Sequence, residues 1–208
     1  MKFTPVISIL DYGSGNLRSV LNVLEYLGYK VHITKNLDLI DSSTHLILPG
    51  VGSYKNCVEK IKKNLSFRLI KNQIIDKQKP LLGICVGMQV LSSSGYENGE
   101  HDGLNIIKGK VVKLENTLLP VPQVGWNEIE IKKKDPIFDG IPNKSEFYFL
   151  HSYQFKSKSE KNILSSTNYE NSFTSIISEK KIYGVQFHPE KSQTYGLRLL
   201  KNFVENLK

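Results

Sequence analysis

The sequence has little cysteine, little arginine and no long apolar run. Only two of its 208 residues are cysteine, Cys57 and Cys85, and neither belongs to a CxxC pair. A disulfide framework and a thiolate zinc site therefore have little support, and a thiol is left free for chemistry. No apolar stretch approaches the roughly 18 residues that a membrane-spanning helix needs, and the N-terminus lacks a signal-peptide pattern. These absences predict a cytoplasmic protein without a membrane segment.

Arginine is scarce although the chain is basic. The formal net charge is +8, and Arg18, Arg68 and Arg198 are the only arginines. Because arginine reads bases better than lysine does, a lysine-based charge gives little support for nucleic acid binding. The lysines are spread along the chain and are densest at 131–134, so we interpret them as solvated surface. The excess charge is at most a weak hint of an acidic protein partner.

Motifs for nucleotides and metals are incomplete. Gly13 and Gly15 follow an apolar run as in a dinucleotide fingerprint, but Arg18 occupies the position of the third glycine. No G-K-[ST] sequence occurs anywhere in the chain. Apart from the histidine discussed below, the histidines are scattered without ligand spacing. We expect neither a metal site nor any other cofactor.

The first half of the chain alternates between strand-like and helical patterns. Apolar runs rich in β-branched residues lie at 6–10, 29–34, 45–50 and 80–85, and segments of helical period separate them. Such alternation predicts a parallel sheet covered by helices. A length of 208 residues fits one domain, which we assign to residues 1–208.

The second half of the chain has few helical segments and many strand-like ones. After about residue 104, strand-like runs are separated by polar turns rather than helices, at 109–115, 127–133, 146–155, 172–178 and 181–187. This pattern predicts largely antiparallel strands. A closing helix is expected over 192–207, with Ser192 as its N-cap. The predicted fold class is therefore α/β, with a central, mostly parallel sheet flanked by helices and an antiparallel extension.

The strongest local signal surrounds Cys85. The run PLLGIC at 80–85 passes directly into a helical pattern, and Gly83 and Gly87 flank the cysteine. This G-x-nucleophile-x-G pattern is typical of a nucleophile elbow, whose tight strand-to-helix bend needs small neighbours. Free N–H groups and the helix dipole at such a site favour the thiolate form. We predict that Cys85 is a nucleophile, whereas Cys57, inside an amphipathic helical segment without such glycines, is structural.

A base for this thiol is found in GVQFHPEKS at 184–192. His188 is followed two positions later by Glu190. In an extended segment, side chains two positions apart point the same way, and Pro189 between them favours extended backbone. Glu190 can then fix the tautomer of His188 while the other ring nitrogen faces the thiol. A satisfied surface pair is the simpler explanation of a lone His near a carboxylate, but its coincidence with the Cys85 elbow favours a catalytic role.

An oxyanion hole is the third requirement. LILPGVGSY at 46–54 places a glycine-flanked loop directly after a predicted strand, and such a loop can turn its amides outward. We predict the N–H of Val51 as one donor. Elbow geometry makes the N–H of Val86, the residue after the nucleophile, the second donor.

Three motifs together resemble those of class I glutamine amidotransferases: GICVGMQ (83–89), QFHPEKS (186–192) and PGVG (49–52). The resemblance spans essentially the whole chain. It implies the flavodoxin-like α/β fold of that family and a glutaminase whose triad is Cys85, His188 and Glu190. Within the family, DYGSGNLRSV (11–20), VGWNEI (124–129) and FLHSY (149–153) are similar to the glutaminase subunits of imidazole glycerol phosphate synthases, which serve histidine biosynthesis.

The resemblance also implies a substrate and its contacts. L-Glutamine would be attacked by Cys85 at its side-chain amide, with release of ammonia and hydrolysis of a glutamyl thioester. The residues implied in holding it are Gly52, Gln89, Glu97, Ser152 and Tyr153. Gln89 and Glu97 would reach its polar end.

A partner is implied as well. Members of the subfamily pair as heterodimers with a (β/α)8-barrel cyclase that receives ammonia through a channel, and isolated glutaminases of this kind have low activity. Asn16, Arg18, Trp126 and Tyr148 match positions that line this interface. Sealed docking is chemically sensible, because ammonia released into water near pH 7 is mostly protonated.

Some segments favour other hypotheses. PVPQV at 120–124 and SSSGYENGEHDG at 92–103 depart from the usual subfamily pattern. This leaves open a paralogous glutaminase subunit that supplies ammonia to amidotransfer on a bacterial surface or flagellar sugar. A catalytically silent regulatory module is disfavoured by the intact triad. A peptidase is disfavoured because Gln89 and Glu97 would then have no purpose.

Overall fold

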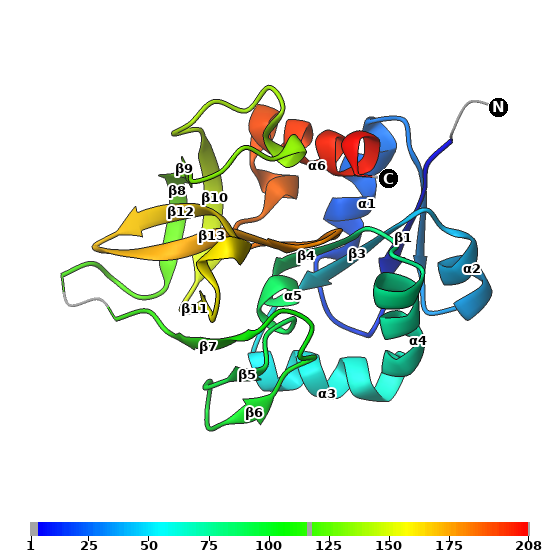
Figure 1. The fold of residues 1–208 in the computed structure, drawn as a ribbon, viewed down its shortest axis with the longest axis horizontal. Coiled ribbons are helices and arrows are strands. Elements are labelled where there is room, and N and C mark those ends of the chain that lie inside the picture. The colour runs from blue at the N-terminus through cyan, green and yellow to red at the C-terminus, as the bar shows by residue number, and fades with distance from the viewer. Residues whose placement is uncertain (1–3, 116–117, 208) are drawn as a thin grey trace.

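A computed structural model describes residues 4–115 and 118–207, and its centre is a twisted sheet (Figure 1). Side by side and parallel lie β2 (Lys30–Thr34), β1 (Val6–Leu10), β3 (His45–Gly50), β4 (Leu81–Cys85) and β14 (Ile182–Val185). Strands β3, β4 and β14 are buried along their whole length. Parallel central strands are covered on both faces, which explains their continuous apolar runs.

Helices cover both faces of this sheet. Helices α1 (Leu17–Tyr26) and α6 (Gln193–Asn206) lie on one face, and α3 (Tyr54–Asn64) and α4 (Phe67–Lys71) lie on the other (Figure 1). The shorter elements are α2 (Leu37–Ser42), a π-helical turn (Asn72–Asp76) and α5 (Val86–Gln89). None of the helices in the described ranges is long and apolar enough to cross a membrane.

The first helix follows its sequence pattern closely. Val20 and Leu24 of α1 are buried, and Leu17, Leu21 and Leu27 pack against the same core. Gly28 has a φ of +86°, and its N–H donates to the carbonyl of Glu25, so the chain leaves the helix through a left-handed residue as expected.

The antiparallel extension continues the main sheet beyond β14. Its strands are β13 (Asn171–Glu179), β12 (Ile163–Tyr169) and β9 (Glu130–Ile131). A separate ribbon pairs β8 (Gln123–Glu128) with β10 (Glu146–His151). A third sheet contains β11 (Tyr153–Ser157), β7 (Gly109–Lys113), β5 (Ser94–Gly95) and β6 (His101–Asp102). Single 3-10 turns lie at Pro136–Phe138, Glu160–Asn162 and Pro189–Lys191. The predicted α/β fold class is confirmed.

Three strand predictions in this half were wrong in detail. The run 127–133 is not one strand, because its first two residues end β8 and only Glu130–Ile131 form β9 in another sheet. The run 146–155 is not one strand, because it divides at Ser152 between the ribbon and the third sheet. Phe147, Phe149 and His151 are buried in alternation, and the alternation then breaks. The run 181–187 does not belong wholly to the antiparallel part, because β14 pairs in parallel with β4. Its burial on both faces is the signature of a central strand.

The sheet topology brings distant segments to one edge. In parallel strands the carboxyl ends meet at the same edge, where ligands of α/β proteins bind. Residues 11–16 follow β1, residues 51–52 follow β3, Val86 follows β4, and residues 186–190 follow β14. The predicted catalytic segments therefore lie around a common crevice.

Candidate active site

Cys85 occupies a sharp turn between β4 and α5. Its φ is +55° and its ψ is −113°, a conformation that side-chain-bearing residues rarely adopt. The flanking glycines are required by the backbone of this elbow. A Cβ on Gly87 would lie 1.8 Å from the carbonyl oxygen of Leu48, and one on Gly83 would lie 2.6 Å from that of Gly87. The strained turn packs directly on β3 and leaves Cys85 almost fully buried at the crevice.

His188 and Glu190 form a buried pair. Nδ1 of His188 lies 2.9 Å from Oε1 of Glu190, and both side chains are buried. Nδ2 of Asn16 donates to the same oxygen at 3.3 Å. The pair is not made along an extended segment as predicted, because Pro189–Lys191 form a 3-10 turn that begins after His188. Proline suits the first position of such a turn, since its fixed φ is helical.

The surroundings of His188 keep its ring protonated. Burial lowers the pKa of His188, but hydrogen bonding to Cys85 and Glu190 and the charges of both groups raise it to about 10. The carboxylate at Nδ1 orients the ring, so Nε2 is the nitrogen left for Cys85. At neutral pH the histidine can therefore donate a proton on the side of the sulfur.

Ser192 was expected to cap the closing helix, and the structure gives it another contact. It precedes α6, but its side chain makes no capping hydrogen bond. Its hydroxyl donates to the carbonyl of His188 at 2.6 Å and accepts from the N–H of Tyr148 at 3.0 Å. The N–H of His188 in turn donates to the carbonyl of Tyr148 at 2.9 Å. These bonds fix the His188 backbone against β10.

A cavity of about 590 Å³ lies at the crevice and collects most of the predicted site residues. Those that line it are Cys85, His188, Val51, Val86, Gly52, Gln89, Glu97, Ser152, Tyr153 and Asn16. It is also lined by residues to which the sequence analysis gave no role at the site, namely Ser19, Pro122, Leu150, His151 and Lys191. Glu190 lies behind His188 rather than on the wall.

Gln89 and Glu97 are held at this cavity by hydrogen bonds. Nε2 of Gln89 donates to the carbonyl of Tyr153 at 2.9 Å and to Oε1 of Gln186 at 3.0 Å. Both hydrogens of its NH₂ are thus used, which leaves its oxygen as the group that can meet a ligand. Oε2 of Glu97 accepts from the N–H of Tyr54 at 2.6 Å. Desolvation and the charge of Glu97 together raise the pKa of Tyr153.

The two residues predicted as oxyanion donors both border the cavity. Val51 is 40% exposed and Val86 is buried directly after Cys85. The carbonyl of Val51 accepts from Oγ of Ser14 at 3.2 Å and from Sγ of Cys57 at 3.4 Å. Burial raises the pKa of Cys57, so this second cysteine stays a thiol and fixes the loop.

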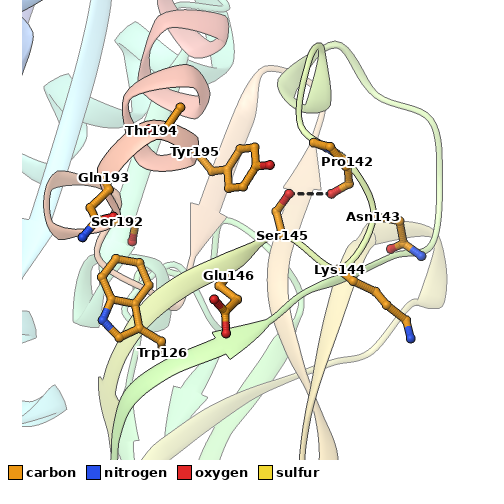
Figure 2. A pocket seen from close by; sticks show the side chains of 10 residues that line it. All are labelled: Trp126, Pro142, Asn143, Lys144, Ser145, Glu146, Ser192, Gln193, Thr194 and Tyr195. Atoms are coloured by element: carbon orange, nitrogen blue, oxygen red, sulfur yellow. Dashed lines mark hydrogen bonds between the residues drawn. The ribbon is translucent and has the colours of Figure 1, made fainter.

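The residues expected at a partner interface separate into two groups. Asn16 lines the cavity, whereas Arg18 is exposed on α1. The rings of Trp126 and Tyr148 meet edge to face, with centroids 6.1 Å apart on the β8–β10 ribbon. Trp126 also borders a second cavity of about 560 Å³, between the start of α6 and the loop before β10, as Figure 2 shows. That loop is braced by the hydrogen bond from Ser145 Oγ to the Pro142 carbonyl (Figure 2).

His151 is a site residue that the sequence reasoning missed. It lies 2.9 Å from the carbonyl of Tyr153 through Nδ1 and 3.0 Å from the side chain of Gln123 through Nε2. Burial lowers its pKa to about 4, so it is neutral near pH 7 and donates through one nitrogen only. Nδ1–H donates to the carbonyl, and the Gln123 carboxamide must therefore turn its NH₂ toward Nε2. The sequence signal that could have found it is its place in the FLHSY motif, between the buried alternation of β10 and Ser152.

Comparison with known proteins identifies the family. Residues 8–207 match the family described as glutamine amidotransferase class-I, and the chain belongs to that family.

No group of three or more His, Cys, Asp or Glu that could hold a metal occurs in residues 4–115 and 118–207.

Particular relatives match over nearly their whole length. The chain is 44% identical over 200 residues to imidazole glycerol phosphate synthase subunit HisH 1 of Campylobacter jejuni, covering 96% of this chain and 99% of that protein. It is 41% identical over 201 residues to subunit HisH 2 of Methanococcus maripaludis, with the same coverage. Among solved structures, PurLQS from Thermotoga maritima superposes with a TM-score of 0.75 at 15% identity, covering 99% of this chain and 100% of that one. That likeness shows the fold alone.

Proposed function

We propose that this chain is the glutaminase subunit of imidazole glycerol phosphate synthase, which hydrolyses L-glutamine to glutamate and ammonia for histidine biosynthesis. The observation that carries the proposal is the meeting of Cys85 and His188 at one cavity, where contact with Cys85 helps to raise the pKa of the histidine. The choice of this synthase among amidotransferases is supported by relatives of 41–44% identity that align over almost their full length.

The reaction follows from these groups. The sulfur of Cys85 attacks the side-chain amide carbon of glutamine, and the N–H groups of Val51 and Val86 stabilise the negative charge that develops on the amide oxygen. The imidazolium of His188 gives its proton to the nitrogen, which leaves as ammonia and creates a glutamyl thioester. A water molecule then loses a proton to His188, attacks the thioester and releases glutamate. Glu190 holds Nδ1 of His188 throughout both steps.

The polar contacts of the cavity support an amino acid as substrate. Gln89 offers its carboxamide oxygen, because both hydrogens of its NH₂ are bound elsewhere. Glu97 adds a carboxylate aimed by the Tyr54 N–H. Two acceptors suit the α-ammonium of glutamine, which carries three donors. Gly52, Ser152 and Tyr153 complete the wall near these groups.

A partner subunit is the second part of the proposal. Apolar side chains lie around the cavity rim, since Val51 and Leu150 are 40% and 41% exposed and both line it. Trp126 and Tyr148 continue this surface along the ribbon. We infer that a (β/α)8-barrel cyclase covers the rim as a heterodimer and receives the ammonia before water can protonate it.

The variant Cys85→Ala tests the nucleophile. We expect the assembled complex to lose glutamate release entirely, whereas binding to the cyclase is unchanged because the side chain is buried away from the rim. Glutamate would be measured by a coupled dehydrogenase assay and binding by calorimetry. Turnover by the purified variant would refute the assignment, and loss of binding would show that the fold itself had been damaged.

Identifying the acceptor decides between this synthase and a sugar-modifying paralogue. The chain would be expressed with an affinity tag in its native cell, and the co-purified barrel protein would be supplied with glutamine and candidate acceptors. Incorporation of ¹⁵N from the glutamine amide into an imidazole product supports the proposal. Incorporation into a sugar nucleotide would assign the chain to the paralogous function suggested by its PVPQV segment.

A further inference from the structure

Gln186 is a buried polar residue next to the nucleophile. It directly follows β14, two positions before His188, and it is fully buried. Burying a carboxamide is costly unless its nitrogen and oxygen both find partners. Here Nε2 lies 3.8 Å from Sγ of Cys85, within hydrogen-bonding range for sulfur, and Oε1 lies 3.0 Å from Nε2 of Gln89.

The direction of the Gln186 carboxamide is fixed by its neighbours. Gln89 faces two oxygen atoms, the carbonyl of Tyr153 and Oε1 of Gln186, so its NH₂ must point toward both. Since the oxygen of Gln186 thereby faces Gln89, its NH₂ is the end that faces Cys85. A donor directed at the sulfur fixes where the Cys85 side chain lies at the cavity.

The backbone of Gln186 leaves its side chain little freedom. Its N–H donates to the carbonyl of Ser175 at 2.9 Å on β13, and β14 lies between β4 and β13 in the sheet. The residue is thus placed by the sheet and not by a loop. Its two side-chain contacts connect Cys85 on β4 with Gln89 at the end of α5.

We propose that Gln186 is a positioning residue that serves both ends of the glutaminase site. Its NH₂ holds the Cys85 sulfur in place at the wall of the cavity. Its oxygen holds the Gln89 carboxamide so that the oxygen of Gln89 faces the substrate ammonium. The part of the inference that concerns Gln89 rests on the proposed function, whereas the part that concerns Cys85 does not require any particular substrate.

Two substitutions separate these contacts. Gln186→Met keeps the length of the side chain and removes both hydrogen bonds. Gln186→Glu keeps an acceptor for Gln89 but replaces the donor at the sulfur with a carboxylate. Gln73→Met is the matched control, because Gln73 is also buried but its side chain donates to Asp41, outside the cavity.

The first readout is alkylation of Cys85 by iodoacetamide at pH 7 in the folded chain, followed by mass spectrometry of the peptide that contains it. No glutamine is involved, so the result stands even if the wild-type protein proves not to hydrolyse glutamine. We expect both Gln186 variants to react about 3- to 10-fold more slowly, because the sulfur loses the hydrogen bond that holds it at the cavity. Wild-type rates in both folded variants would overturn the proposal.

The second readout is steady-state hydrolysis of glutamine by the assembled complex. We expect Gln186→Glu to lower kcat with little change in KM, because Gln89 keeps its acceptor. Gln186→Met should lower kcat and also raise KM, and Gln73→Met should change neither. If Gln186→Met fails to fold, Gln186→Glu still decides the role at the sulfur. An equal fall in kcat for Gln73→Met would point to a general packing effect and would contradict the proposal.

Discussion

His188 keeps its proton because of the two groups on either side of it. Burial alone would make the ring neutral, since a charged imidazolium is poorly solvated in the interior. Hydrogen bonding to Cys85 and Glu190, together with their charges, outweighs this penalty and raises the pKa of His188 to about 10. His151, equally buried but without a carboxylate or thiolate beside it, moves the other way, to a pKa of about 4. The groups beside each ring, and not burial, thus decide that one histidine is charged and the other neutral in the same cavity.

Removing the sulfur should release the His188 proton more easily. In Cys85→Ala the hydrogen bond and the charge of Cys85 are lost, so we expect the pKa of His188 to fall from about 10 toward its ordinary value of 6.5. The Cε1–H resonance of His188, followed by NMR from pH 5 to 11, measures the change. An unchanged titration in the variant would mean that Glu190 alone sets the protonation state.

The raised pKa of His188 also makes the free energy of unfolding depend on pH. A pKa that is higher in the folded state than in the unfolded state stabilises the fold below the unfolded value, and this contribution is lost as the pH rises through the folded value. Here that window extends from 6.5 to about 10. The free energy of unfolding of the wild-type chain should therefore fall with pH in this window, and more steeply than that of Cys85→Ala.

At the scale of elements, the elbow at Cys85 is the place where the main chains of β3 and α5 come into direct contact. Strand β3 passes so close to the start of α5 that a Cβ on Gly50 would lie 2.3 Å from the N–H nitrogen of Gly87. Gly83 and Gly87 are equally crowded by main-chain atoms. Main-chain atoms in a sheet cannot move aside as a flexible side chain can. The two glycine motifs, PGVG and GICVG, therefore supply the small residues on the two segments that contact each other here.

The substitution Gly87→Ala should disrupt this contact. We expect it to lower the free energy of unfolding by about 3 kcal/mol or more, because the added methyl would lie 1.8 Å from the Leu48 carbonyl oxygen. Gly28→Ala is the comparison, since no atom lies within 4 Å of its added Cβ and only its φ of +86° opposes alanine. We expect that variant to lose about 1 kcal/mol. Urea unfolding of both proteins distinguishes steric crowding from backbone conformation, and equal losses would contradict the crowding argument.

At the scale of the whole molecule, several exposed apolar side chains lie on the β8–β10 ribbon, whose residue Leu150 also lines the cavity. Val124 and Trp126 on β8 are 57% and 45% exposed, and Leu150 on β10 is 41% exposed. These residues project from the ribbon that also carries Tyr148. Contiguous exposed apolar side chains beside a catalytic cavity are typical of a docking surface. A partner placed there would cover the cavity from which ammonia is released.

Truncating Trp126 should weaken that docking. We expect Trp126→Ala to raise the Kd for the cyclase about 10-fold or more, because large aromatic side chains dominate interface energies. Tyr26→Ala is the control, since Tyr26 is 79% exposed at the far end of α1 from Arg18. Calorimetric titration of both variants measures the effect. Equal affinities for wild type and Trp126→Ala would show that the cyclase binds elsewhere on the surface.

The sequence by itself determined the fold class, the parallel first half and the identity of the elbow. Strands at 6–10 and 45–50 agree with their predictions to the residue, because a buried apolar run and a glycine-rich turn are local signals. The pattern G-x-Cys-x-G is also a local signal, because it lies within five consecutive residues, although the crowding at Gly87 comes from Leu48 on β3. Each of these features can be read from neighbouring positions in the chain.

Only the tertiary structure decided which side chains meet. Asn16 contacts Glu190 across 174 positions, and Gln186 contacts Cys85 across 101, so no local pattern could reveal either pair. The division of 146–155 between two sheets, the contact of His151 with Gln123 and the contact of Ser192 with Tyr148 likewise join separate parts of the chain. The physical reason is that buried polar groups form hydrogen bonds with the partners that the fold places beside them. Which partners lie nearby depends on how the strands are ordered in the sheet and not on the spacing of residues along the chain.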